Sequence, residues 1–138
     1  MRVVAYIDGG AKGNPGEAGY GVVLKNEKTD ILVAAGRYIG HSTNNVAEYR
    51  GLMGCLEIVA KFEVSALTVY SDSELLVKQM KGIYRVRKPH LQELHAQILN
   101  TINRSPYHFE IHHIPREKNS EADGLAGRAI RLRSDIDE

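Results

Sequence analysis

The hydrophobic pattern in the first third of the chain has the period of β-strands. Runs rich in β-branched and aromatic residues occupy residues 3–8, 20–24 and 31–38. Residues 9–16 read GGAKGNPG, and so many glycines with a proline predict a turn throughout. Polar residues 26–30 join the second run to the third. Three strands with short links predict an antiparallel meander.

The period then changes to that of helices. Thr43, Asn44 and Asn45 are residue types favoured at helix N-termini, and apolar residues follow at helical spacing through residues 46–61. The remaining pattern predicts, in order, a strand at 67–71, a helix at 73–81, a helix from Pro89, a strand at 109–114 and a helix at 120–133. This order predicts a single α/β domain over residues 1–138, with a mixed sheet and a polar tail at 134–138.

Composition narrows the class of protein. A chain of 138 residues, 43% hydrophobic and 25% charged, fits one globular domain. No apolar run approaches the roughly 20 residues that span a bilayer. The one cysteine, Cys55, cannot form an internal disulfide, and we expect a cytoplasmic protein. Because the formal net charge is only +1, a nucleic-acid partner would require a local basic patch.

Two acidic residues follow predicted strands. Asp8 ends the first strand and Asp72 comes directly after the fourth. If these strands are parallel neighbours, both carboxylates emerge at one edge of the sheet, where open α/β sheets bind ligands.

Two more acidic residues lie on helical stripes with apolar residues. These stripes join Glu48 to Leu52, Cys55 and Val59, and Asp123 to Ala126 and Ile130.

Each of the four acids also has a purely structural explanation. Asn45-x-x-Glu48 and Ser120-x-x-Asp123 match the capping box, Asp72 could cap the helix after it, and Asp8 could start a turn. Together, however, four acids directed at one sheet edge repel one another unless a cation lies between them. Magnesium prefers carboxylate and phosphate oxygens, so the pattern predicts a magnesium site.

Four segments resemble, in order, the acidic motifs of type 1 ribonuclease H: YIDGGAKGNPGEAGYGVVL, STNNVAEYRGL, VYSDSELLVKQM and REKNSEADGLA. The resemblance covers nearly the whole chain. It implies the ribonuclease H-like α/β fold, a five-stranded mixed sheet in which two parallel strands are added to three antiparallel ones. It implies a catalytic tetrad of metal ligands, Asp8, Glu48, Asp72 and Asp123. It also implies an endonuclease that cuts the RNA strand of RNA/DNA hybrids with two Mg²⁺ ions, Mn²⁺ being an alternative, and leaves 5′-phosphate and 3′-hydroxyl ends.

The same resemblance implies substrate-binding positions. They are Gly10, Ala11 and Asn14 beside the RNA strand, Asn44, Glu48 and Glu74 near its 2′-hydroxyls, and Asn14, Thr43 and Asn45 near the DNA strand. The 2′-hydroxyl is what distinguishes RNA from DNA at a site. Turn and capping chemistry is the alternative explanation for these residues.

The sequence departs from the family pattern in two places. Well-known members carry a long basic insertion with tryptophans, whereas residues 81–89 here are short and the chain has no tryptophan. We expect Arg85, Arg87 and Lys88 to bind substrate instead, with Tyr84 as a stacking surface; a solvated basic face is the alternative. Many members also have a loop histidine before the fourth acid, where this chain has residues 115–119, PREKN. We expect Arg116 to replace it.

Two other functions fit the same features. One is another two-metal nuclease of the same fold, although the chain is short for an enzyme with an added DNA-binding module. The other is a module that binds RNA/DNA hybrids without cutting them, although four retained acids are costly without a metal. We expect a monomeric enzyme with no obligate protein partner.

Overall fold

A six-stranded sheet forms the centre of the molecule, in the strand order β5-β4-β1-β2-β3-β6. The computed structural model describes residues 1–138. Its strands are β1 (Arg2–Lys12), β2 (Gly16–Asn26), β3 (Ile31–Ser42), β4 (Ala66–Ser71), β5 (His108–His113) and β6 (Ile136–Asp137). Its helices are α1 (Asn44–Val59), α2 (Glu74–Met80), α3 (Pro89–Arg104) and α4 (Ser120–Leu132), with a 3₁₀ turn, η1 (Arg116–Lys118).

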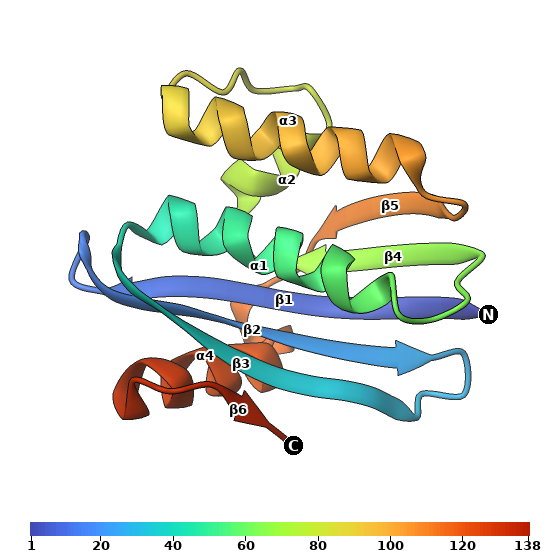
Figure 1. The fold of residues 1–138 in the computed structure, drawn as a ribbon, viewed down its shortest axis with the longest axis horizontal. Helices are drawn as coiled ribbons and strands as arrows, with labels where there is room; N and C mark the ends of the chain where they lie inside the picture. Colours follow the sequence, from blue (N-terminus) through green and yellow to red (C-terminus); the bar gives the residue numbers. More distant parts are fainter.

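The pairing confirms the predicted fold class. β1, β2 and β3 form an antiparallel meander, β4 pairs in parallel with β1, and β5 pairs in parallel with β4. α1 covers one face of the sheet, with α2 and α3 beyond it, and α4 lies on the opposite face (Figure 1). The main hydrophobic core lies between α1 and the sheet, where Leu52 and Leu56 meet Val3 and Ile7. No helix is both long and apolar enough to cross a membrane.

Residues 9–16 are not a turn throughout, and that prediction was wrong. β1 continues to Lys12 and β2 begins at Gly16, so only three residues lie between the strands. Two glycines of these strands, Gly9 and Gly21, are required because helices pack against them, whereas Gly13 lies in the actual turn with a φ of +84°. A Cβ atom on Gly9 would lie 2.3 Å from the carbonyl oxygen of Ala47 in α1, and one on Gly21 would lie 2.1 Å from that of Ala122 in α4. Glycine in a strand here marks close approach of another backbone.

The C-terminal tail contains a sixth strand, which corrects the predicted count of five. β6 pairs antiparallel with β3 at Ala35 and Gly36. Arg37 holds it in place, because its guanidinium donates hydrogen bonds to the carbonyl of Ile136 at 3.2 Å and to Asp137 at 2.9 Å. A two-residue strand has no periodicity of its own, and only its partners identify it.

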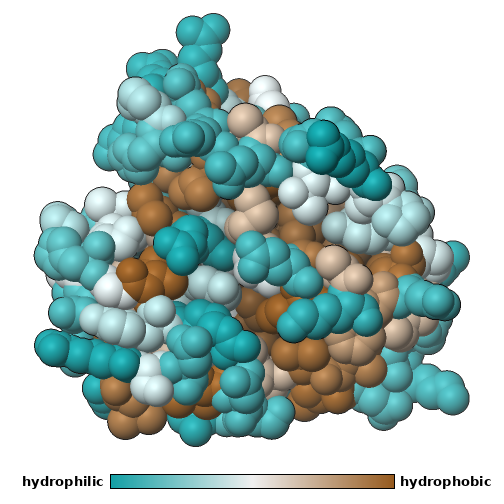
Figure 2. All heavy atoms as spheres, viewed as in Figure 1, coloured by the Kyte–Doolittle hydropathy of each residue, from teal (hydrophilic) through white to brown (hydrophobic).

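Hydrophilic residues cover α3 at the top of the molecule, and hydrophobic residues are visible at the centre and lower right of the same face (Figure 2). The large exposed apolar side chains include Ile83 and Tyr84, which follow α2. They directly precede the predicted basic segment of Arg85, Arg87 and Lys88.

Candidate active site

Asp8 and Asp72 project from neighbouring parallel strands, as predicted. The pairing of β1 with β4 ends at Ile7 and Ser71, one residue before each acid. Both side chains are largely buried: Asp8 is 9% exposed, and the side chain of Asp72 is 10% exposed. β4 does end before Asp72, but β1 continues beyond Asp8, which therefore lies within a strand rather than at its end.

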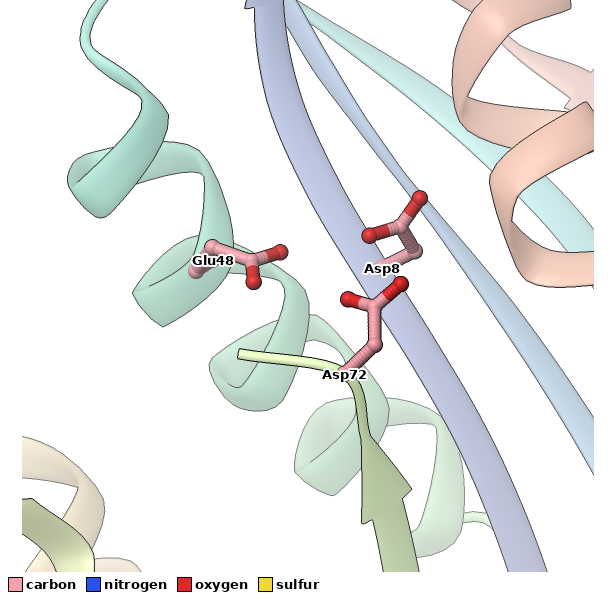
Figure 3. Close-up of side chains that lie close together, drawn as sticks. All are labelled: Asp8, Glu48 and Asp72. Carbon is pink, nitrogen blue, oxygen red and sulfur yellow. The ribbon is translucent and has the colours of Figure 1, made fainter. Parts of the chain in front are cut away.

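Glu48 brings a third carboxylate to the same place from the second turn of α1. It accepts a hydrogen bond from the backbone N–H of Gly9. Each of the three acids offers one oxygen, and these oxygens all lie within 4.8 Å of one another. Figure 3 shows the three carboxylates pointing toward a common space from β1, α1 and the end of β4.

Helix capping does not explain these acids. The N-cap of α1 is Thr43, whose hydroxyl accepts from the N–H of Val46 at 3.2 Å. The N-cap of α2 is Ser73 rather than Asp72, and its hydroxyl accepts from the N–H of Leu76 at 3.2 Å. The structural alternatives for Glu48 and Asp72 are therefore wrong.

Asp123 joins the same cavity from the first turn of α4 on the opposite face of the sheet. It is more exposed than the other three and does not belong to the group of mutually close oxygens. Its carboxyl lies close enough to raise the pKa of Asp8. The structure thus brings all four predicted acids into one cavity, three of them in a tight cluster.

The cluster raises the pKa of its most buried members. Burial is the main cause of the raised pKa of Asp8, and the neighbouring charge of Glu48 adds to it. Burial also raises the pKa of Glu48 to about 8, against the opposing effect of the hydrogen bond from Gly9. Both shifts mean that negative charge is disfavoured here unless positive charge compensates for it.

A divalent cation fits this donor set. The three clustered ligands offer only carboxylate oxygens, which hard cations prefer. Asp72 Oδ2 is buried and has no hydrogen-bond partner in the protein. An unpaired buried carboxylate oxygen is costly, and a bound cation would remove that cost.

The acids line a cavity of about 580 Å³ together with several of the predicted substrate-binding residues. Those residues are Gly10, Ala11, Asn44 and Asn45, and the predicted loop residue Arg116 lines the cavity with them. The cavity wall also contains Ala126 and Ile130, from the predicted stripe of Asp123, and residues that the sequence did not single out: Lys12, Ser73, Gly127 and Arg131. Lys12 and Arg131 place positive charge at its rim, but an isolated charge in a strand or helix gives no signal in the sequence.

Asn14 and Thr43 do not line the cavity, but both support its wall. The Asn14 side chain accepts from the N–H of Asn44 at 3.0 Å, and the Asn44 side chain accepts from the N–H of Ala11 at 2.7 Å. These bonds fix the turn after β1 to the start of α1. Glu74 lies outside the cavity on the surface, where its carboxylate is 2.7 Å from Lys78 Nζ.

The basic segment after α2 lines a second hollow beside the first. Arg85, Arg87 and Lys88 share this hollow of about 500 Å³ with Asn45, which also lines the acidic cavity. Tyr84 is half exposed, but Lys78 Nζ lies 4.9 Å from the centre of its ring. That ring is therefore already in contact with a cation.

Arg116 lies in η1 at the mouth of the acidic cavity. Its side chain is 87% exposed, and its Nε lies 4.0 Å from Asp72 Oδ2. That distance permits charge attraction but exceeds a hydrogen bond. The guanidinium therefore remains free to bind an anion from solvent.

Comparison with known proteins agrees with this geometry. A family described as "Reverse transcriptase-like" matches residues 6–129. The "Ribonuclease H" of Alkalilimnicola ehrlichii is 32% identical over 139 residues, covering 91% of this chain and 92% of that protein. The crystal structure of "LC11-RNase H1 in complex with RNA/DNA hybrid" superimposes with a TM-score of 0.91 at 43% identity, covering 96% of this chain and 99% of that one. This chain belongs to the type 1 ribonuclease H family.

Some relatives of this chain are considerably longer than it is. The bifunctional protein Rv2228c of Mycobacterium tuberculosis is 40% identical over 134 residues, which are 94% of this chain but 36% of that protein. The chain thus spans about a third of the length of the first curated relatives that it matches. The solved structure described as the N-terminal RNase H domain of Rv2228c superimposes on this chain with a TM-score of 0.90 at 38% identity, covering 96% of this chain and 95% of that one.

Proposed function

We propose that this chain is a ribonuclease H, an endonuclease that hydrolyses the RNA strand of RNA/DNA hybrids and leaves 5′-phosphate and 3′-hydroxyl ends. The observation that carries the proposal is the meeting of Asp8, Glu48 and Asp72 oxygens within 4.8 Å of one another. The related LC11 enzyme, 43% identical, has been crystallised with such a hybrid.

The metal we propose is magnesium, as two ions bound with the substrate, and manganese is expected to substitute for it. Asp8, Glu48, Asp72 and Asp123 would hold the ions. When bound, the ions lower the pKa of the attacking water and neutralise charge on the leaving 3′ oxygen. The protein contributes a fixed set of carboxylates, of which Glu48 is held by Gly9 and Asp72 keeps an unpaired oxygen.

The substrate would lie across both hollows. For the RNA strand, we propose Gly10, Ala11, Asn14, Asn44, Glu48 and Glu74. For the DNA strand and one of its phosphates, we propose Asn14, Thr43 and Asn45. Arg85, Arg87 and Lys88 are proposed to bind the substrate without preference for either strand. Asn45 supports this path because it lines the hollow of the acids and that of the basic segment.

Arg116 is proposed to hold a phosphate oxygen during cleavage or product release. Its exposed guanidinium lies at the cavity mouth beside Asp72. A guanidinium stays protonated and can bind phosphate through two parallel hydrogen bonds. It would therefore provide fixed charge rather than transfer a proton.

A cleavage assay tests the proposed function. We expect an internally labelled RNA/DNA hybrid to be cut in Mg²⁺ and to remain intact in EDTA, and RNA ends that carry 5′-phosphates. Single-stranded RNA and duplex DNA of the same sequence serve as controls. Tight binding of the hybrid with no cleavage in either Mg²⁺ or Mn²⁺ would instead identify a hybrid-binding module.

We also propose that the chain acts as a monomer in the cytoplasm. Its single cysteine, Cys55, is buried and so is not exposed for a disulfide between two chains. Light scattering after size-exclusion chromatography should give a mass close to 15.3 kDa. A mass of twice this value at micromolar concentration would show a dimer.

A further inference from the structure

The three acids of the tight cluster all lie on or beside residues 7–9 of β1. Glu48 accepts from the N–H of Gly9, and Asp72 follows the β4 residue that pairs with Ile7. The fourth acid, Asp123, comes from α4 on the other face of the sheet and needs a separate connection to this segment.

Asn119 provides that connection. Its side-chain Nδ2 donates to the carbonyl of Ile7 at 2.8 Å, in the peptide unit that precedes Asp8. Its own carbonyl accepts from the N–H of Asp123 at 3.1 Å. Asn119 is thus hydrogen-bonded to the backbone directly before Asp8 and to the backbone of Asp123, so it links the two acids.

Asparagine at a helix N-cap usually uses its side chain to accept a hydrogen bond from the first turn, but the side chain of Asn119 bonds to Ile7 instead. Asn119 is the N-cap of α4, yet its side chain makes no capping hydrogen bond. It is 1% exposed, and its Oδ1 is buried without a partner. Capping side chains normally accept from the first turn of the helix. Here the amide is directed away from the helix and toward the strand that carries Asp8.

We infer that Asn119 is a positioning residue that sets the distance between Asp8 and Asp123 and thereby the affinity of the site for its metal ions. It touches neither substrate nor metal and acts through the two acids. The inference rests on the proposed metal-dependent function, but it concerns metal binding before any substrate is present. Partners that orient metal ligands typically change metal affinity or activity by about 10- to 100-fold when they are replaced.

Replacement by serine separates positioning from capping. Serine is a good N-cap but is too short to reach the carbonyl of Ile7. We expect Asn119→Ser to weaken Mn²⁺ binding by about tenfold in calorimetry without substrate, and to raise the Mg²⁺ concentration for half-maximal cleavage similarly. The KM for the hybrid should stay unchanged, because the side chain is buried. Asn119→Leu has a similar size but no N–H to donate to the carbonyl of Ile7, so it should also lose affinity.

Leu125→Ala is the matched control, since Leu125 is buried on α4 in a separate small cluster with Val23 and Ala34. It should lower the melting temperature in EDTA and leave Mn²⁺ affinity unchanged. Wild-type affinity in the Asn119 variants, or an equal loss in Leu125→Ala, would overturn the inference. A wild-type chain that binds Mn²⁺ but cuts no hybrid would contradict the proposed function and leave this comparison intact.

Discussion

The carboxylate of Glu48 accepts a hydrogen bond from the backbone N–H of Gly9, which joins α1 to β1 one residue beyond Asp8. Only glycine allows this contact, because a Cβ atom on residue 9 would lie 2.6 Å from the backbone nitrogen of Glu48. The close approach of helix and strand brings two acids of different elements together. It also buries them, and that burial is what raises the pKa of both carboxyls.

Removing one charge from the cluster should abolish catalysis without preventing substrate binding. We expect Asp8→Asn and Asp72→Asn to lower the cleavage rate by at least about 10³-fold, or about 4 kcal/mol, because each removes a metal-bridging charge but little volume. The dissociation constant for the hybrid in Ca²⁺ should change little. Glu121→Gln, on the same helix turn as Asp123 but paired with Lys25 at 3.0 Å, is the control and should cleave normally. Near-wild-type turnover in either aspartate variant would remove that residue from the site.

The raised pKa values make the stability of the metal-free protein depend on pH. Unfolded carboxyls titrate near pH 4, whereas the folded pKa of Glu48 is about 8 and that of Asp8 is also raised. Between these values the folded state binds more protons than the unfolded one, so stability falls as pH rises through this window.

Asp8→Asn should therefore be more stable than wild type at pH 8.5 in EDTA. We expect the free energy of unfolding of the variant to exceed that of wild type by at least about 1.4 kcal/mol, or about 4 °C in melting temperature. This difference should become smaller toward pH 5. Saturating Mg²⁺ should make wild type the more stable of the two proteins, since the ion binds folded wild type more tightly than the folded variant. A wild-type protein that melts no lower than the variant at pH 8.5 in EDTA would show that the cluster is not strained by its charge.

Local patterns were sufficient to predict the four α-helices, five of the six strands, and the positions of Glu48 and Asp72. The stripe of Glu48 with Leu52 predicted that an acid faces the core, and the strand before Asp72 predicted its place at the sheet edge. Both signals are short-range, because helix and strand periods repeat within a few residues. The ends of the elements were less accurate, and β1 runs four residues beyond Asp8.

The features that the sequence did not reveal depend on residues far apart in the chain. Asn119 bonds to Ile7 across 112 positions, and its place in a polar loop gave no sign of burial. β6 pairs with β3 at Ala35 and Gly36, and Arg37 donates a hydrogen bond to Asp137, 100 positions away. Gly9 of β1 resembled part of a turn in the sequence, but it is needed because α1 packs against it rather than for its own conformation.

The basic segment should contribute to affinity through counterion release. Replacing Arg85, Arg87 and Lys88 together by alanine should weaken hybrid binding and reduce the slope of log affinity against log salt by about 2 to 3 units. The control replaces three surface cations at other places in the fold, Lys28, Lys61 and Arg104. An unchanged slope in the first variant, or an equal change in the control, would show that the segment is only a solvated face.

Arg116 should affect turnover more than binding. If its guanidinium holds a phosphate oxygen as charge develops or as product leaves, Arg116→Ala should lower kcat by about tenfold, or about 1.4 kcal/mol, and raise KM by less. Arg116→Lys should recover only part of the loss, because an ammonium lacks the planar pair of donors. Since arginine stays protonated over the working range, the variants should keep the wild-type shape of the pH–rate profile between pH 6 and 9. Glu117→Gln, the next residue of η1, is the control for disturbance of the turn. Full turnover in both Arg116 variants would mean that the enzyme cleaves without assistance from this loop.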